Sequence, residues 1–301
     1  MLALYEVQDF LKRAGRGEVD SSRLEHLIEQ FGEDCKESLR KQLSRDEGYR
    51  IRMSGLGRPL CQQKLEQQGN KQEMGYNDIM RFLMGDLVEA VAVFVLKSAE
   101  VKVVDTQRAC ELDIDGTIVK GTLDLIMNDG VDKVWDIKST SPWSYDNKFA
   151  SRGGYDVIKE DDPFGYIMQG FLYAEAQGMP FGGWIAINKS SGEWTFTEAP
   201  EDQEEDRKQY IADAKERVRS LLEDKGFKIP FTPEDETYTV SKQKVKTGNK
   251  LMPKTCTFCS FKSICWKNAE YLPKVTSKAK FPPTVWYTKV ETIESWTVLQ
   301  I

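Results

Sequence analysis

Apolar residues recur at three- and four-residue intervals near the start of the chain, which is the spacing of one face of an α-helix. This spacing predicts helices over Leu2 to Ala14 and over Ser21 to Leu43, the second with Ser21 or Ser22 as its N-cap. These two helices make residues 1–50 a charged helical appendage. A further strong helix is predicted from about Tyr76 to Ser98.

The pattern then changes to short apolar runs separated by turn residues, which is typical of strands. Strands are predicted at Val101 to Val104, at Leu112 to Met127 with a turn at Asp115-Gly116, and at Val131 to Lys138. An Asn-Asp-Gly turn, residues 128–130, joins the last two. These segments form a meander of three or four strands.

Helical spacing returns at about Phe164 to Gln177 and in a last long helix from about Glu201 to Leu222. Between them lie two predicted strands, Gly183 to Asn188 and Trp194 to Thr197. A helix, three strands, a helix and another strand in this order indicate an α/β fold, a mixed sheet flanked by helices.

Composition places the chain among ordinary globular proteins. It has 301 residues, of which 40% are hydrophobic and 30% charged. No apolar run approaches the length of a membrane span, and the first residues lack the pattern of a signal peptide, so we expect a cytoplasmic protein with no membrane partner. The single histidine, His26, excludes metal sites that need a histidine pair.

The net charge of -6 argues against a nucleic-acid partner, but the charge is unevenly distributed. From Ser241 to Lys280 there are ten lysines and one acidic residue, Glu270. Such a run is either a solvated surface or a surface for a polyanion.

Two acidic residues end neighbouring predicted strands. Asp124 ends one strand, Asp136-Ile137-Lys138 ends the next, and a hairpin would bring them together, with Asp136 and Lys138 on the face of Val134. Carboxylates suit divalent cations that activate water for attack on phosphorus, and an ammonium stabilises the developing charge. Asp-x-Lys occurs five times, but only here does it end an apolar strand.

The helix before the hairpin carries an acid on its apolar face. Glu89 lies among Phe82, Ala92, Val93 and Leu96 at helical intervals, so its carboxylate needs an ion partner, a metal, or a place at the edge of that face. Gly85, one turn earlier, is expected to let another element approach closely.

Four motifs follow one another along the chain: Gly85-x3-Glu89, Gly121-x2-Asp124, Asp136-Ile137-Lys138 and Gln169-x3-Tyr173. As an ordered set, they resemble the RecB-type branch of the PD-(D/E)xK nucleases. The resemblance implies a restriction-endonuclease-like core in which Asp124, Asp136 and the Ile137 carbonyl hold Mg or Mn, and Glu89 completes the site. It also implies that Lys138 positions the water, while Gln169 and Tyr173 arrange the site and contact DNA. Many relatives carry a histidine near the helix acid as a manganese ligand, and this chain has none there.

Three of the six cysteines are tightly spaced, as Cys256-x2-Cys259-x5-Cys265, and Cys61 is the natural fourth ligand. Four thiolates suit zinc or an iron-sulfur cluster. The arrangement of one remote cysteine followed by this trio resembles that of AddB-type nuclease subunits and of the exonuclease of CRISPR adaptation. That resemblance implies a 4Fe-4S cluster closing a nuclease core over residues 51–270, with residues 271–301 as a C-terminal tail. Cys35 and Cys110 are expected to be buried apolar residues.

These features predict a metal-dependent DNA exonuclease acting on single-stranded DNA or DNA ends, with a helicase or recombination partner. Lys244, Lys246 and Lys250 are the expected phosphate contacts. The alternatives are a catalytically inert DNA-binding subunit, an endonuclease or junction resolvase, and a zinc-stapled structural protein.

Overall fold

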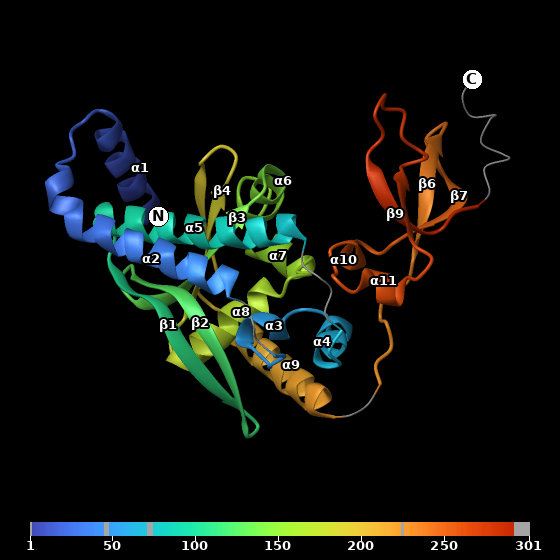
Figure 1. The fold of residues 1–301 in the computed structure, drawn as a ribbon, viewed down its shortest axis with the longest axis horizontal. Coiled ribbons are helices and arrows are strands. Elements are labelled where there is room, and N and C mark those ends of the chain that lie inside the picture. Colours follow the sequence, from blue (N-terminus) through green and yellow to red (C-terminus); the bar gives the residue numbers. More distant parts are fainter. Residues whose placement is uncertain (1, 45–47, 71–74, 224–225, 292–301) are drawn as a thin grey trace. The chain divides into compact units, whose positions relative to one another are not determined.

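The computed structural model describes residues 2–44, 48–70, 75–223 and 226–291 (Figure 1). The chain forms two compact units, the first made of residues 1–63 and 73–224 and the second of residues 64–72 and 225–301. The division after residue 224 falls inside the range 51–270 that the sequence predicts as one core.

The first unit is built on a five-stranded mixed sheet in the order β1-β2-β3-β4-β5. The strands are β1 (Val103–Ile114), β2 (Thr117–Asn128), β3 (Asp132–Thr140), β4 (Phe181–Asn188) and β5 (Trp194–Glu198). All neighbours are antiparallel except β3 and β4, which are parallel and are connected through helix α8 (Tyr166–Gln177). The predicted mixed α/β architecture is confirmed, and the meander has three strands.

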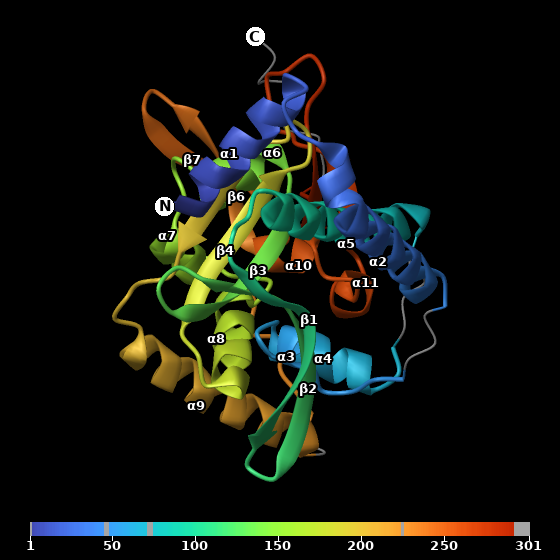
Figure 2. The same ribbon diagram turned by 90° about the vertical axis from the view of Figure 1, so that its left-hand side faces the viewer.

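Helices cover both faces of this sheet, as Figure 2 shows. On one face, α1 (Leu2–Gly15) and α5 (Tyr76–Ser98) pack over Trp135 and Ile137 of β3. On the other, α3 (Met53–Leu56), α8 and α9 (Glu204–Leu222) pack over a core that includes Val134. The alternation predicted for β3 is therefore present, and it directs Asp136 and Lys138 toward the α8 face.

The remaining helices of the first unit differ in detail from the prediction. The second N-terminal helix begins as a 3-10 turn, η1 (Ser21–Leu24), and continues as α2 (Glu25–Leu43). Its N-cap is Asp20, whose carboxylate accepts from the Ser22 amide, so the serine N-cap prediction was wrong. The segment predicted as a polar loop contains α6 (Pro142–Ser144), the short π-helix η2 (Tyr145–Phe149) and α7 (Tyr155–Glu160).

The second unit contains a sheet that the sequence pattern did not predict. Its strands, β6 (Glu234–Val240), β7 (Gln243–Leu251), β8 (Glu270–Pro273) and β9 (Thr284–Lys289), lie in the order β6-β7-β9-β8. Two short helices, α10 (Lys254–Thr257) and α11 (Lys262–Cys265), precede β8. The predicted C-terminal tail, residues 271–301, therefore contains most of β8 and all of β9. Its residues 292–301 lie outside the described residues.

A buried carboxylate holds this second sheet together. Glu236 of β6 is 1% exposed and accepts hydrogen bonds from Tyr287 Oη at 2.7 Å, Asn249 Nδ2 at 2.8 Å and Thr247 Oγ1 at 3.0 Å. Because these donors belong to β7 and β9, one side chain joins three strands. A buried carboxylate is tolerated when its oxygens are hydrogen-bonded in this way.

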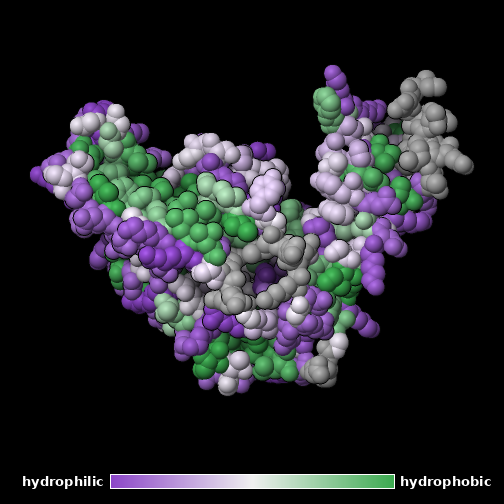
Figure 3. Space-filling model, viewed as in Figure 1, coloured by the Kyte–Doolittle hydropathy of each residue, from purple (hydrophilic) through white to green (hydrophobic). Residues whose placement is uncertain are grey.

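Part of the surface of the first unit is apolar. Figure 3 shows hydrophobic surface over α1 and α5, and the exposed apolar side chains of α5 include Tyr76, Met80 and Met84. Within the described residues, no helix combines the length and apolar character needed to cross a bilayer.

Candidate active site

The β2–β3 hairpin brings two of the predicted acids together. Its register pairs Leu125 with Trp135 and Ile126 with Val134, and one further step along the strands sets Asp124 opposite Asp136. The Ile137 amide donates to Asp124 Oδ2 at 2.8 Å, which ties the two strands at this point. The Asn-Asp-Gly turn therefore sets the register that places both carboxylates.

Asp136 is the most buried member of the group, at 2% exposure. Gln169 Nε2 donates to its Oδ1 at 3.2 Å. Its Oδ2 is buried without a directed hydrogen bond in the described part of the chain, and it lies 2.6 Å from Lys138 Nζ. Burial lowers the pKa of Lys138, but the carboxylates of Asp136 and Asp124 outweigh burial and raise this pKa above its ordinary value.

Glu89 reaches the same place from α5. Burial raises its pKa to about 7, and the charge of Asp136 adds to this shift. The pKa of Asp124 is also raised, first by burial and then by the charges of Glu89 and Asp136. The three carboxylates are thus close enough to repel one another, with Lys138 as the nearby cation.

Helix α8 supports the group from the other side, and it comes very close to β2. A Cβ on Gly121 would lie 2.5 Å from Tyr173 Cε1, so only glycine leaves room for this ring. Tyr173 is 3% exposed and packs on Gly121 in this structure, and its contact with DNA stays a prediction. At Gly85 the expectation of a close approach was wrong, because no described atom lies within 4 Å of where its Cβ would be.

Two residues that the sequence reasoning missed contact this group, and a third supports the helix beside it. Gln107 of β1 donates its side-chain amide to Glu89, and its own φ is +50°, which is uncommon for a non-glycine residue. The ring of Tyr166 lies against Lys138, and Asp162 hydrogen-bonds the start of α8. A signal existed for Tyr166, which precedes Gln169 by three residues and so shares its helix face.

The donor set has the chemistry of a Mg or Mn site, since these cations prefer carboxylate and carbonyl oxygens. Mutual repulsion among the three acids fits a group that a cation would stabilise, and Lys138 Nζ, 2.6 Å from Asp136 Oδ2, already supplies one positive charge. As the side chains stand, however, the described residues contain no group of three or more His, Cys, Asp or Glu arranged to hold a metal ion.

The cysteines are all thiols, and none forms a disulfide. Cys256, Cys259 and Cys265 lie on α10, α11 and the turn between them in the second unit. They are near enough to interact: burial raises the pKa of Cys256, and the other two thiols raise it further. Cys61 is buried in α4 (Leu60–Gln67). The boundary between the two units divides this helix, so Cys61 belongs to the first unit and the residues from Lys64 onward belong to the second.

The three lysines expected to contact phosphate lie on β7. Lys246 and Lys250 both form ion pairs with Asp235, and hydrogen bonds from these two lysines lower the pKa of Asp235 to about 2. Lys244 is exposed, and no ion pair with it is found in the described residues. The carboxylate of Asp235 therefore partly neutralises the predicted phosphate contacts.

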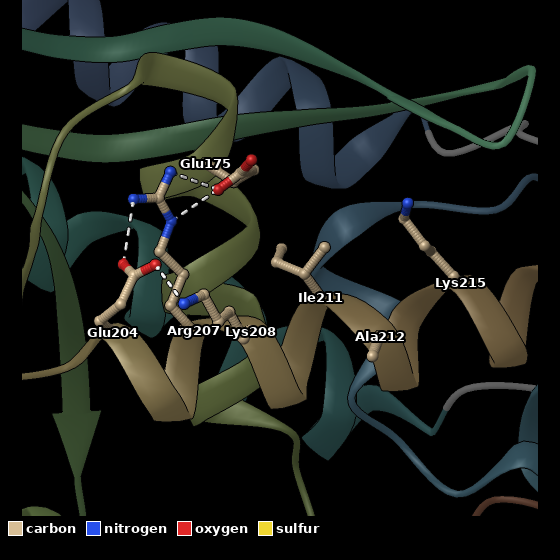
Figure 4. A pocket seen from close by; sticks show the side chains of 7 residues that line it. All are labelled: Glu175, Glu204, Arg207, Lys208, Ile211, Ala212 and Lys215. Carbon is tan, nitrogen blue, oxygen red and sulfur yellow. Dashed lines mark hydrogen bonds and ion pairs between the residues drawn. The ribbon is translucent and has the colours of Figure 1, made fainter.

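A shallow pocket lies elsewhere, between α8 and α9 (Figure 4). Arg207 reaches Glu175 of α8, and Lys208 reaches Glu204 on its own helix at 3.2 Å. Lys215, which also lines the pocket, forms an ion pair with Asp115 at 3.3 Å. Each charged side chain that lines the pocket therefore has a partner of opposite charge.

Comparisons with known proteins identify no family. No family model matches the sequence, and no curated protein matches it. A solved structure described as "Crystal structure of SSO0001" is similar at 17% identity with a TM-score of 0.40, covering 79% of this chain and 96% of that chain. This likeness is too distant to carry an argument. The fold and the site together define a mixed α/β protein with a cluster of three carboxylates and one lysine at the junction of α5, β2, β3 and α8.

Proposed function

We propose that this protein is a metal-dependent DNA exonuclease that hydrolyses phosphodiester bonds in single-stranded DNA or at DNA ends. The observation that carries the proposal is the convergence of Glu89, Asp124 and Asp136 with Lys138, in the order and on the elements of the RecB-type motif. Burial and neighbouring carboxylates raise the pKa of both Glu89 and Asp124, which is costly for folding, and such costs are concentrated at functional sites.

Each residue has a defined role in this proposal. Asp124, Asp136 and the Ile137 carbonyl would bind Mg or Mn, and Glu89 would complete the site. The bound cation would supply Lewis-acid activation of a water for in-line attack on phosphorus. Lys138, whose raised pKa keeps it protonated at neutral pH, donates hydrogen bonds that orient that water and stabilise the negative charge developing on the phosphate oxygens.

The direct test is Asp136→Ala. We expect this variant to lose Mg- or Mn-dependent cleavage of single-stranded DNA while binding DNA at least as well as the wild type, because a ligand and a negative charge are removed together. The matched control is Asp213→Ala, which removes the acid of another Asp-x-Lys triplet, at a partly exposed position of α9. Cleavage retained by pure Asp136→Ala protein would overturn the assignment.

We also propose that Cys61, Cys256, Cys259 and Cys265 bind a 4Fe-4S cluster. Support comes from the sequence spacing and from the three thiols that interact within the second unit. Protein purified anaerobically should be coloured, and Cys61→Ala and Cys259→Ala should both lose iron and sulfide and melt at a lower temperature. Cys35→Ala and Cys110→Ala serve as controls with full iron content. Zinc without iron in the wild-type protein would favour a structural zinc site instead.

A further inference from the structure

The first turn of α8 is fixed in place on two sides. The Asp162 carboxylate accepts hydrogen bonds from the amides of Gly165, Tyr166 and Ile167 at 2.8, 2.9 and 2.9 Å. Gly165 has a φ of +77°, and a Cβ there would lie 2.3 Å from the backbone of Gly57. A helix start with its amides satisfied and its backbone against another backbone has little freedom to shift.

This turn presents Tyr166 to the lysine of the site. Lys138 Nζ lies 4.7 Å from the centroid of the Tyr166 ring, within the range of a cation–π interaction. The ring is in turn held by other aromatics, stacked on Phe164 at 5.5 Å and tilted against Phe149 at 6.2 Å. The Lys138 side chain is only 17% exposed, so water screens this attraction weakly.

One face of α8 therefore contacts the site at Lys138 and Asp136 and packs on β2. Tyr166, Gln169 and Tyr173 follow one another at intervals of three and four residues, which aligns them along the helix. Tyr166 meets Lys138, Gln169 meets Asp136, and Tyr173 packs on Gly121 of β2.

We infer that Tyr166 is a positioning residue for the proposed hydrolysis, because the face of its ring holds the Lys138 ammonium beside Asp136. This inference rests on the proposed function. A lysine side chain is long and flexible, and the Asp136 carboxylate is a partner that it would share with a bound cation. The ring attracts the ammonium without competing for carboxylate oxygens, so it keeps Lys138 in place when Asp136 is engaged.

The test compares Tyr166→Phe, which keeps the ring, with Tyr166→Leu, which removes it. Phe171→Leu is the control, because it truncates a fully buried aromatic of the same helix whose ring packs on Phe181 and Tyr210. For cleavage of single-stranded DNA with Mn, we expect kcat of Tyr166→Leu to fall by about tenfold or more with KM unchanged, given the strength of a desolvated cation–π contact. We expect Tyr166→Phe to stay within about twofold of the wild type, as the ring face is preserved.

A second measurement reads the contact without activity. In protein labelled with 13C at the lysine ε-carbon, the Lys138 resonance, assigned by its loss in Lys138→Met, should be shifted by the ring in the wild type and in Tyr166→Phe. It should move to the ordinary lysine position in Tyr166→Leu and stay unmoved in Phe171→Leu.

Wild-type kcat in Tyr166→Leu, or equal losses in Tyr166→Phe and Tyr166→Leu, would overturn the positioning role. A Lys138 resonance that ignores the loss of the ring would overturn the contact itself. Wild-type protein that cleaves no DNA but still shows the shifted resonance would instead overturn the proposed function, and with it the catalytic consequence of the contact.

Discussion

At the scale of single residues, the acids of the site should make folding stability depend on pH. The folded-state pKa of Glu89 is about 7, raised by burial and by Asp136, against an ordinary value of 4.5. A group with a raised folded-state pKa contributes stability that is fully present below the ordinary value and lost as the pH rises through the folded value. The metal-free protein should therefore lose stability between about pH 4.5 and pH 7.

Glu89→Gln removes this titration. Measured by thermal unfolding in chelator, its melting temperature should exceed that of the wild type by about 3 °C or more at pH 8, and by much less at pH 4.5. Glu216→Gln, an exposed change on α9, should leave the pH dependence intact. If Glu89→Gln follows the wild-type pH dependence in parallel, the carboxylate is not in the environment described.

Two glycines of the motif should respond in opposite ways to alanine. Gly121→Ala forces a methyl group into the ring of Tyr173 and should destabilise the protein by about 1–3 kcal/mol. Gly85→Ala adds a methyl where no described atom lies within 4 Å, in the middle of α5, and should stabilise it by about 0.5–1 kcal/mol. Chemical denaturation measures both, and a Gly121→Ala protein as stable as the wild type would contradict the packing of α8 on β2.

At the scale of secondary-structure elements, long periodic segments were predictable and short polar ones were not. Helix α5 has the predicted bounds, Tyr76 to Ser98, because its apolar face continues over many turns. The β2–β3 hairpin was predictable from its turn, and with it the meeting of Asp124 and Asp136.

The sheet of the second unit was missed because its strands lack an apolar alternation. Lysines and threonines occupy much of β6 and β7, and the central buried side chain of β6 is a glutamate, whose hydrogen-bond partners lie up to 51 residues away. Gln107 was missed for a similar reason, since its contact with Glu89 depends on tertiary packing and not on local spacing.

The β6–β7 hairpin yields a prediction about DNA binding. Asp235→Asn should free Lys246 and Lys250 from their ion pairs, so affinity for single-stranded DNA should rise and its dependence on salt should steepen by about one to two in log–log slope. Glu234→Gln changes the charge equally on an exposed neighbour and should have the smaller effect. Fluorescence titrations at several salt concentrations distinguish them, and identical slopes for the two variants would assign these lysines to a solvated surface.

At the scale of the whole molecule, charge divides along the chain. Residues 225–301 contain 13 lysines and 6 acidic residues, a net charge of +7, whereas residues 1–224 carry -13. A polyanion is attracted to residues 225–301 and repelled by residues 1–224. In the proposed function, the basic segment would bind the DNA backbone, and the carboxylates of the acidic segment would need a divalent cation before a phosphate could approach.

The most direct measurement is a time course of digestion with two single-stranded DNA substrates of the same sequence, one linear and end-labelled, the other a covalently closed circle. With Mg or Mn, we predict that the wild-type protein degrades the linear strand and leaves the circle intact, and that chelator or Asp136→Ala abolishes the degradation. Cleavage of the circle would show an endonuclease instead. Failure to cleave either substrate with either metal would contradict the account of Glu89, Asp124, Asp136 and Lys138 as a nuclease site.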